Sequence, residues 1–360
     1  MKNVAFKLSG FFLLSLLVLS CSKTETGSSQ IPLKDALTSS TQNLNNAITD
    51  ISASQAFQLL SVNSGTTLKS GTMMTTTTGY SALIPLSLVK GVYDYKALKT
   101  EESSHYPLIR FFTKSASTSN MVVNMPLSKL KNPHELREYH KADSTLTNNF
   151  SISVSDYHNN YNNYHDYDYV NVADISIDNV KAGGLNIMSI VSPNHNTQYA
   201  SQFDFANGYA AKYLYSSGDT TVSSFTILKA GGILYQEKLL TIRKDTAKFG
   251  REHQYILTIG NVKIVRKYGS PAEVYINGVL DSKAVVTIID DDDDENEESE
   301  HSITNKRDIQ ITFADGTVST VSALIGNSIT NISTLFTSLH QVYFAAYVVD
   351  WIAYDVYYKR

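Results

Sequence analysis

The protein chain has 360 residues, a formal net charge of −4 at pH 7 and charged side chains at only 18% of its positions. No stretch concentrates lysine and arginine into the basic stripe that nucleic acid requires, which argues against a nucleic-acid partner. The single cysteine leaves no partner for an internal disulfide, so the fold must be stabilised by its core. The 23 tyrosines, with abundant serine, threonine and asparagine, favour a half-exposed antiparallel sheet over a helical bundle.

The first 21 residues have the organisation of a secretory signal. Two lysines precede an uncharged run from Leu8 to Leu19, which is shorter than the roughly 20 residues needed to span a bilayer. The segment Val18-Leu19-Ser20-Cys21 resembles the lipobox of bacterial lipoproteins. That resemblance implies removal of residues 1–20, attachment of a diacylglycerol to the Cys21 thiol and acylation of the new amine. Cys21 is therefore the expected lipid attachment site.

Residues 21–30 are predicted to form a flexible tether between membrane and domain, because their side chains are short and polar. The segment Cys21-Ser22-Lys23-Thr24-Glu25 is similar to the lysine-and-acid signals of surface-exposed lipoproteins in Bacteroidota, although Glu25 is its only acid. These resemblances imply a lipid anchor in the outer membrane and leave both its periplasmic and its surface side open. The lipid anchor makes the membrane an expected partner of the protein.

Residues 31–360 are expected to form a single α+β domain that begins with a helix over Leu33–Ser61. An amphipathic helix of this kind normally packs its apolar face on the domain. The apolar residues that recur at helical spacing are Leu33, Leu37, Leu44, Ile48 and Ile51.

Strand patterns follow the first helix. Prolines at positions 85, 107 and 126 interrupt or bound them, so we expect a broken sheet in this part of the chain. The expected strands are Ala82–Val89, Gly91–Leu98, Leu108–Thr113 and Met121–Met125.

A short helix is predicted from Asn132, and it carries an incomplete version of the HExxH zinc motif. That motif places two histidines four residues apart on one helical face. Here His140 is six residues from His134 and lies on another face, while position 138 is glutamate. His134 and Glu138 could share a metal ion, but we favour a solvent-exposed helix and predict no metal site.

The segment Asp156–Val172 has five tyrosines interleaved with histidine, asparagine and aspartate, and it is the main candidate for ligand contacts. In one interpretation Tyr157, Tyr161 and Tyr164 stack on the faces of sugars, while asparagine and aspartate bind the hydroxyl groups. In a second, the histidines and aspartates hold a divalent ion. In the third, which we favour, the segment is a hairpin whose rings are half-buried against cross-strand neighbours.

The rest of the chain up to residue 313 predicts an antiparallel meander. We expect turns at Gly183-Gly184, Asn207-Gly208, Gly231-Gly232 and Asn277-Gly278, because such pairs between strand patterns favour hairpins. The expected strands are Ala173–Val180, Leu185–Val191, Ala200–Ala206, Gly208–Ser216, Thr220–Ala230, Gly232–Arg243, His253–Gly260, Val262–Tyr268, Ala272–Ile276, Val279–Ile289 and Asp308–Phe313.

Residues 290–300 form an acidic loop that holds nine of the 34 acidic residues of the chain. Self-repulsion is expected to keep this loop extended. A calcium-binding EF-hand requires glycine at its sixth position and glutamate at its twelfth. Counted from Asp290, those positions hold Glu295 and His301, so we interpret the run as a solvated loop.

The end of the chain, from Ile329 to Tyr358, returns to helical spacing and is apolar nearly all round. A membrane span is the alternative, but Asp350 and Asp355 would be costly inside a bilayer. The fold class that we predict is therefore α+β, with a large antiparallel β-sheet meander covered by an N-terminal and a C-terminal helix. Carriers of acyl chains of the LolA type resemble this arrangement in architecture alone.

The sequence contains no recognisable catalytic motif. A nucleophile elbow, a phosphate loop, a dinucleotide fingerprint and a complete zinc pattern are all absent from it. We therefore expect no cofactor and a non-catalytic binding or structural role with an unknown ligand. The sequence leaves a protein and a glycan open as partners and identifies neither. One alternative is a glycan-binding or glycoside-hydrolysing accessory protein, since two carboxylates beside a sugar need no motif. Another is a lipid carrier with a cavity between sheet and helix.

Overall fold

The computed structural model of the protein describes residues 31–57, 82–96, 107–131, 136, 145–163, 165–194, 196–244, 250–267, 269–290, 307–341 and 343–359. The chain divides into two units at Pro32, and every element below lies in the unit Leu33–Arg360. Several predicted features lie outside the described residues. They are the signal segment, Cys21 and the tether, the incomplete zinc motif of His134, Glu138 and His140, Tyr164, and residues 291–300 of the acidic loop.

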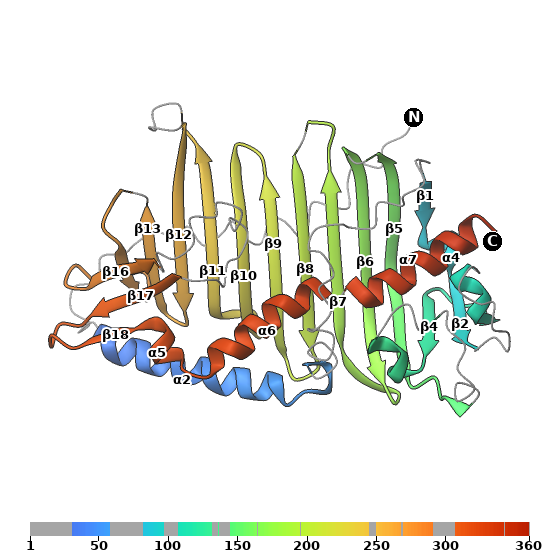
Figure 1. Cartoon of the computed structure of the whole chain (residues 1–360), viewed down its shortest axis with the longest axis horizontal. Helices are drawn as coiled ribbons and strands as arrows, with labels where there is room; N and C mark the ends of the chain where they lie inside the picture. The colour runs from blue at the N-terminus through green and yellow to red at the C-terminus, as the bar shows by residue number, and fades with distance from the viewer. Residues whose placement is uncertain are drawn as a thin grey trace. The chain divides into compact units, whose positions relative to one another are not determined.

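A sheet of fifteen strands is the main element of this unit (Figure 1). Its strands are β1 (Ala82–Pro85), β2 (Gly91–Tyr95), β3 (Phe112–Ala116), β4 (Met121–Met125), β5 (Phe150–Asn163), β6 (Asp166–Ile177), β7 (Val180–Val191), β8 (Thr197–Phe205), β9 (Tyr209–Ser217), β10 (Thr220–Lys229), β11 (Gly232–Arg243), β12 (Arg251–Ile259), β13 (Val262–Lys267), β14 (Glu273–Ile276) and β15 (Val279–Leu280). From β5 to β15, neighbours in the sheet are neighbours in the chain and run antiparallel. The predicted α+β class, with its large meander, is confirmed.

One strand pair departs from the antiparallel pattern. β2 pairs with β4 in parallel, while β3 pairs with the other edge of β2 in antiparallel fashion. The chain therefore returns past β2 between the end of β3 and the start of β4. The sheet is mixed, which the sequence could not show, because the alternation along a strand does not reveal the direction of its neighbour.

A second, three-stranded sheet consists of β16 (Val285–Asp290), β17 (Arg307–Thr312) and β18 (Val318–Thr320). The single strand predicted over Val279–Ile289 is wrong, because it is divided between the two sheets. Asp281 makes the break: its side chain accepts from the backbone N–H of Lys283, and its carbonyl accepts from that of Ala284. An aspartate that bonds its own backbone two residues on initiates a turn.

Helices cover one face of the large sheet, and Figure 1 shows them lying across it. The main ones are α2 (Leu33–Ser52), α5 (Val321–Ile325), α6 (Ser328–Gln341) and α7 (Tyr343–Tyr357). α2 packs on β11, β12 and β13, and α6 packs on β8 and β9. The five apolar residues predicted to form the buried stripe of α2 are all at most 7% exposed, so that stripe is confirmed.

The two terminal helices differ from their predicted lengths. α2 ends at Ser52, and the Ser54 hydroxyl accepts from the backbone N–H of Phe57 to start a separate turn. At the other end, the single helix predicted over Ile329–Tyr358 is two helices, α6 and α7. Among the described residues, no helix has the length and apolar character needed to cross a membrane.

Two predicted strands begin or end as helical turns, and a proline directly precedes each turn. The pattern over Ala82–Val89 is β1 followed by the short helix α4 (Leu86–Val89), which starts after Pro85. The pattern over Leu108–Thr113 is the 3-10 helix η3 (Leu108–Phe111) followed by β3. Proline has no N–H for a sheet but is tolerated at the start of a helical turn, because that N–H would lack a partner anyway.

The predicted turn at Gly183-Gly184 is wrong, because both glycines lie inside β7. The chain turns earlier, at Asp178 and Asn179, whose φ angles are 50° and 64°. A Cβ atom on Gly183 would lie only 2.5 Å from the Phe203 ring. Glycine is therefore needed here to let an aromatic ring of the next strand pack on the backbone.

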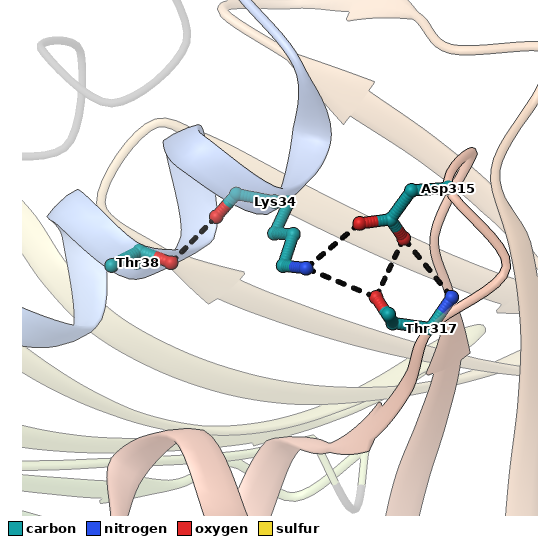
Figure 2. A network of polar contacts seen from close by, with 4 residues as sticks. All are labelled: Lys34, Thr38, Asp315 and Thr317. Carbon is teal, nitrogen blue, oxygen red and sulfur yellow. Dashed lines mark hydrogen bonds and ion pairs between the residues drawn. The ribbon is translucent and has the colours of Figure 1, made fainter.

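A polar network fastens the start of α2 to the turn between β17 and β18, as Figure 2 shows. The Lys34 ammonium donates to the Asp315 carboxylate at 2.8 Å and to the Thr317 hydroxyl at 3.1 Å. Hydrogen bonds from Lys34 and Thr317 hold the pKa of Asp315 well below its usual value. Because both charged side chains are about half exposed, we expect this ion pair to add little to the free energy of unfolding. Its main effect is to orient the start of the helix.

Candidate functional site

The strand register arranges side chains of the helix-covered face into rows that cross the sheet. Residues directly opposite each other on paired strands point to the same face. We use the name tyrosine row for Asn159, Tyr169, Ser189, Tyr199, Tyr215, Ser223, Leu239 and Tyr255, which are successive partners from β5 to β12. The adjacent inner row is Tyr157, Asn171, Ile187, Ser201, Tyr213, Phe225, Glu237 and Leu257.

Helix α6 covers the middle of the inner row. Phe336 packs edge-on against Tyr213, with ring centroids 5.8 Å apart, and against Phe225, with centroids 5.4 Å apart. The tyrosine row lies beside this contact, and its members Tyr199, Tyr215 and Tyr255 are partly exposed. The face therefore changes from an apolar core under the helix to a partly exposed surface rich in tyrosine.

Tyr157, the first of the three predicted ligand contacts, is only 2% exposed. Its hydroxyl donates to Asp350 at 3.1 Å, and its ring packs edge-on against Tyr169. Stacking on a sugar does not fit this position. The reason is a register shift between Val154 and Asp156, which turns Tyr157 toward the helices.

Tyr161 lies where the predicted hairpin interpretation expects it. Its ring stacks with that of Tyr167 on the paired strand, at a centroid distance of 6.5 Å and an interplanar angle of 30°. Both rings are partly exposed, on the same face as the tyrosine row. Tyr164, the third predicted contact, lies outside the described residues.

The histidines and aspartates of this hairpin do not gather into a metal site among the described residues. His158 forms a pair with Asp168 at 3.0 Å, on the face of the hairpin opposite to Tyr157. In the described part of the chain, no group of three or more histidine, cysteine, aspartate or glutamate side chains is placed to hold a metal ion.

Two acidic side chains enclosed beside these rows were not singled out as site residues by the sequence analysis. Asp350 of α7 accepts hydrogen bonds from the hydroxyls of Tyr157 and Tyr169, at 3.1 Å each for its Oδ1 atom. Burial raises the pKa of Asp350 to about 7, although the two tyrosine hydrogen bonds act in the opposite direction. The signal in the sequence was an aspartate within a helix that is apolar on every side.

Glu237 of the inner row has a similar environment. The Tyr235 hydroxyl donates to its Oε1 atom at 2.5 Å, and the Tyr255 hydroxyl donates to the same atom at 3.5 Å. Its Oε2 atom is buried and has no hydrogen-bond partner among the described residues. Burial raises the pKa of Glu237 to about 7, despite the lowering effect of these hydrogen bonds.

These two carboxylates do not form a catalytic pair. Asp350 contacts β5 and β6, whereas Glu237 lies on β11, five strand spacings from β6. Five spacings correspond to about 24 Å, which is far beyond the separation of roughly 5–10 Å that glycoside hydrolysis requires. Each carboxylate can therefore act only within its own group of tyrosines.

Two surface hollows lie elsewhere in the described structure. The larger, of about 580 Å³, is polar and lies at the ends of three hairpins, where it is lined by residues that include Asn196, Asp219 and Arg243. The smaller, of about 270 Å³, lies at the end of α2 beside Asp50 and Asn207. Neither is lined by α6 or α7, the helices under which the predicted lipid-carrier alternative would place a cavity.

No family model, no curated protein and no solved structure matches this chain.

Proposed function

We propose that this protein is a lipid-anchored component of a bacterial cell envelope, held in the outer membrane, that binds its ligand without transforming it. The observation that carries the proposal is the segment Val18-Leu19-Ser20-Cys21 at the end of an apolar signal, followed at once by a polar tether. An anchor of this kind positions a domain at a membrane surface and requires no chemistry from the domain itself.

The binding surface that we propose is the partly exposed part of the helix-covered face. Tyr161, Tyr167, Tyr199, Tyr215 and Tyr255 all point to this face, and all five are partly exposed. Tyrosine rings present a large apolar area and a polar tip with little side-chain entropy to lose, which suits them to contact surfaces.

Metabolic labelling with palmitate in a bacterial host tests the anchor. The wild-type protein is expected to take up the label and to sediment with membranes, and Cys21→Ser is expected to do neither. Ser22→Ala, which leaves the thiol in place, is the matched control and should keep both properties. An unlabelled wild-type protein, or a mature chain that begins elsewhere than at Cys21, would contradict the proposal.

A glycan is the second candidate ligand, and the stacked pair Tyr161–Tyr167 favours it. Two partly exposed rings side by side offer a flat surface on which a sugar ring can lie. On a glycan array, Tyr161→Ala and Tyr167→Ala are each expected to lower binding at least tenfold. Tyr275→Ala, a partly exposed tyrosine on β14, should leave it unchanged. Absence of sugar binding by the wild-type protein would remove this candidate.

A further inference from the structure

We infer that Asp350, Tyr157 and Tyr169 form a proton-controlled latch that holds helix α7 on β5 and β6, tightly in mild acid and more weakly at neutral pH. The name latch is used below for these three residues. It goes beyond the proposed binding role, and its existence depends neither on the lipid anchor nor on the ligand.

The latch is the polar part of an otherwise apolar contact. Val348, Val349 and Ile352 of α7 are fully buried. Tyr157 donates to Asp350 at 3.1 Å, and the Tyr169 hydroxyl lies 3.1 Å and 3.2 Å from the two carboxylate oxygens. One side chain of the helix is thus bonded to two neighbouring strands, and its protonation state alters both bonds together.

No cation among the described residues balances a charge on Asp350. β1 and α4, which pack against α7, contain no titratable residue. Arg110 of η3 is exposed and does not influence the pKa of Asp350. The one titratable residue of α6, His340, has a side chain outside the described structure. The groups that face Asp350 from the sheet are the two tyrosines of the latch. Tyr199 raises the pKa of Tyr169 and is not among the causes that shift the pKa of Asp350.

The acids of β5 and β6 do not face the latch. These acids, Asp156, Asp166, Asp168 and Asp174, lie on the opposite side of the strands from Tyr157 and Tyr169, and they are partly or fully exposed. On its own helix, Asp355 accepts instead from the backbone N–H of Ile109 at 3.1 Å. Among the described residues, the groups that stabilise a charged Asp350 are therefore the Tyr157 and Tyr169 hydroxyls.

Asn171 lies beside the latch and contributes a further buried polar group. Asn171 donates through Nδ2 to the Tyr169 hydroxyl at 3.2 Å. Its Oδ1 atom is buried without a hydrogen-bond partner among the described residues. A buried unsatisfied acceptor next to the Asp350 carboxylate lowers the free energy needed to separate the helix from the sheet at this point.

The direction of the pH effect follows from the proton balance. With α7 in place, burial raises the pKa of Asp350 from 3.8 to about 7, and in the opened state the exposed carboxyl returns to its usual value. Between these two values the closed state binds more protons than the open state. The equilibrium constant for opening of α7 therefore rises roughly tenfold per pH unit within this window, and it levels off above about pH 7.

Hydrogen–deuterium exchange of peptides from α7, corrected for the intrinsic pH dependence of exchange, tests the latch in the purified full chain. From pH 5 to pH 7, the opening equilibrium of wild-type α7 is expected to rise by on the order of 100-fold. Asp350→Asn mimics the protonated acid and should hold α7 closed to the same degree at both pH values. A wild-type helix whose protection does not change with pH, or an Asp350→Asn variant that keeps the change, would overturn the inference.

Glu237→Gln is the matched control, because it removes another acid of raised pKa that bonds tyrosines but lies on β11, five strand spacings from β6. The pH dependence of α7 opening should persist in this variant, and its loss would count against the latch. A second measurement needs no substitution. The ¹³C shift of the Asp350 carboxyl in the wild-type protein should titrate with a midpoint near 7, whereas a midpoint near 4 would overturn the inference.

Discussion

A buried carboxylate makes the stability of the fold depend on pH, and Glu237 shows this effect at a single residue. Burial raises the pKa of Glu237 from 4.5 to about 7, so the folded protein binds a proton at Glu237 in a range where the unfolded chain has lost it. The stabilisation that the protonated Glu237 side chain gives is complete below about pH 4.5 and is lost as pH rises to about 7. The residue therefore destabilises the fold at neutral pH.

Glu237→Gln is accordingly expected to increase the free energy of unfolding at pH 8 by about 1–3 kcal/mol and to change it little at pH 5. The glutamine can still accept the hydrogen bonds of Tyr235 and Tyr255 through its carbonyl oxygen. Urea denaturation at the two pH values measures the effect. An equal loss of stability at both pH values would show that the charged Glu237 carboxylate does not destabilise the fold.

Gly183 illustrates a residue selected by close packing. The Cβ atom of an alanine would lie 2.5 Å from the Phe203 ring and 2.6 Å from the carbonyl oxygen of Asp204. We therefore expect Gly183→Ala to destabilise the protein by about 1–3 kcal/mol. The adjacent Gly184→Ala is the control, because its nearest atom would lie at 3.6 Å. Thermal unfolding that ranks the two variants equally would contradict this explanation.

At the scale of elements, α2 is held mainly by its apolar stripe. Leu37 of this stripe is fully buried, so Leu37→Ala leaves a cavity against the sheet and is expected to cost about 2–5 kcal/mol. Lys34→Met removes the ion pair of Figure 2 and should have a much smaller effect, because both of its charges are half exposed. Denaturant midpoints of the two variants provide the comparison, and a larger effect for Lys34→Met would reverse the assignment.

The hairpin of β5 and β6 shows how an element combines two roles. Its alternation places Tyr157 and Tyr169 under α7, whereas Tyr161 and Tyr167 further along the same face remain partly exposed. The position of α7 therefore decides which tyrosines contribute to the core and which to the surface. No property of the tyrosines themselves distinguishes the two pairs.

For the whole molecule, the contributions of the two acids with raised pKa values should add up in the pH dependence of the free energy of unfolding. Asp350 and Glu237 are about five strand spacings apart, so their effects are independent. The free energy of unfolding is expected to fall between about pH 4.5 and pH 7, and the Asp350→Asn, Glu237→Gln double variant should lose most of this decline. A series of urea denaturations from pH 5 to pH 8 measures it. A double variant with the wild-type pH profile would show that other groups cause the decline.

The large sheet is a meander from β5 to β15, and the sequence predicted most of its strands because each hairpin is a local feature. Asn207-Gly208 and Asn277-Gly278 lie in turns where the glycines adopt positive φ angles of 84° and 81°. The alternation between these turns likewise depends only on neighbouring residues. The predictions failed where a distant contact intervened, as at Gly183, whose role depends on a ring in the next strand.

The candidate site was only partly predictable for the same reason. The sequence drew attention to the tyrosines around Tyr161, but it placed Tyr157 among the surface contacts, because the register shift before it depends on the partner strand. The enclosed environment of Asp350 could not be read from α7 alone. That environment arises where the helix meets two strands that lie nearly 200 residues earlier in the chain.

The sequence by itself determined the local features of this protein: the apolar stripe of α2, the alternation of the meander and most of its turns, because each depends on residues close together in the chain. The tertiary structure alone decided which side chains lie together. It enclosed Asp350 and Glu237 among tyrosines, paired β2 with β4 in parallel and separated the buried tyrosines from the exposed ones. Burial changes the pKa of a carboxyl through the loss of water around it, and a chain can exclude that water only by folding.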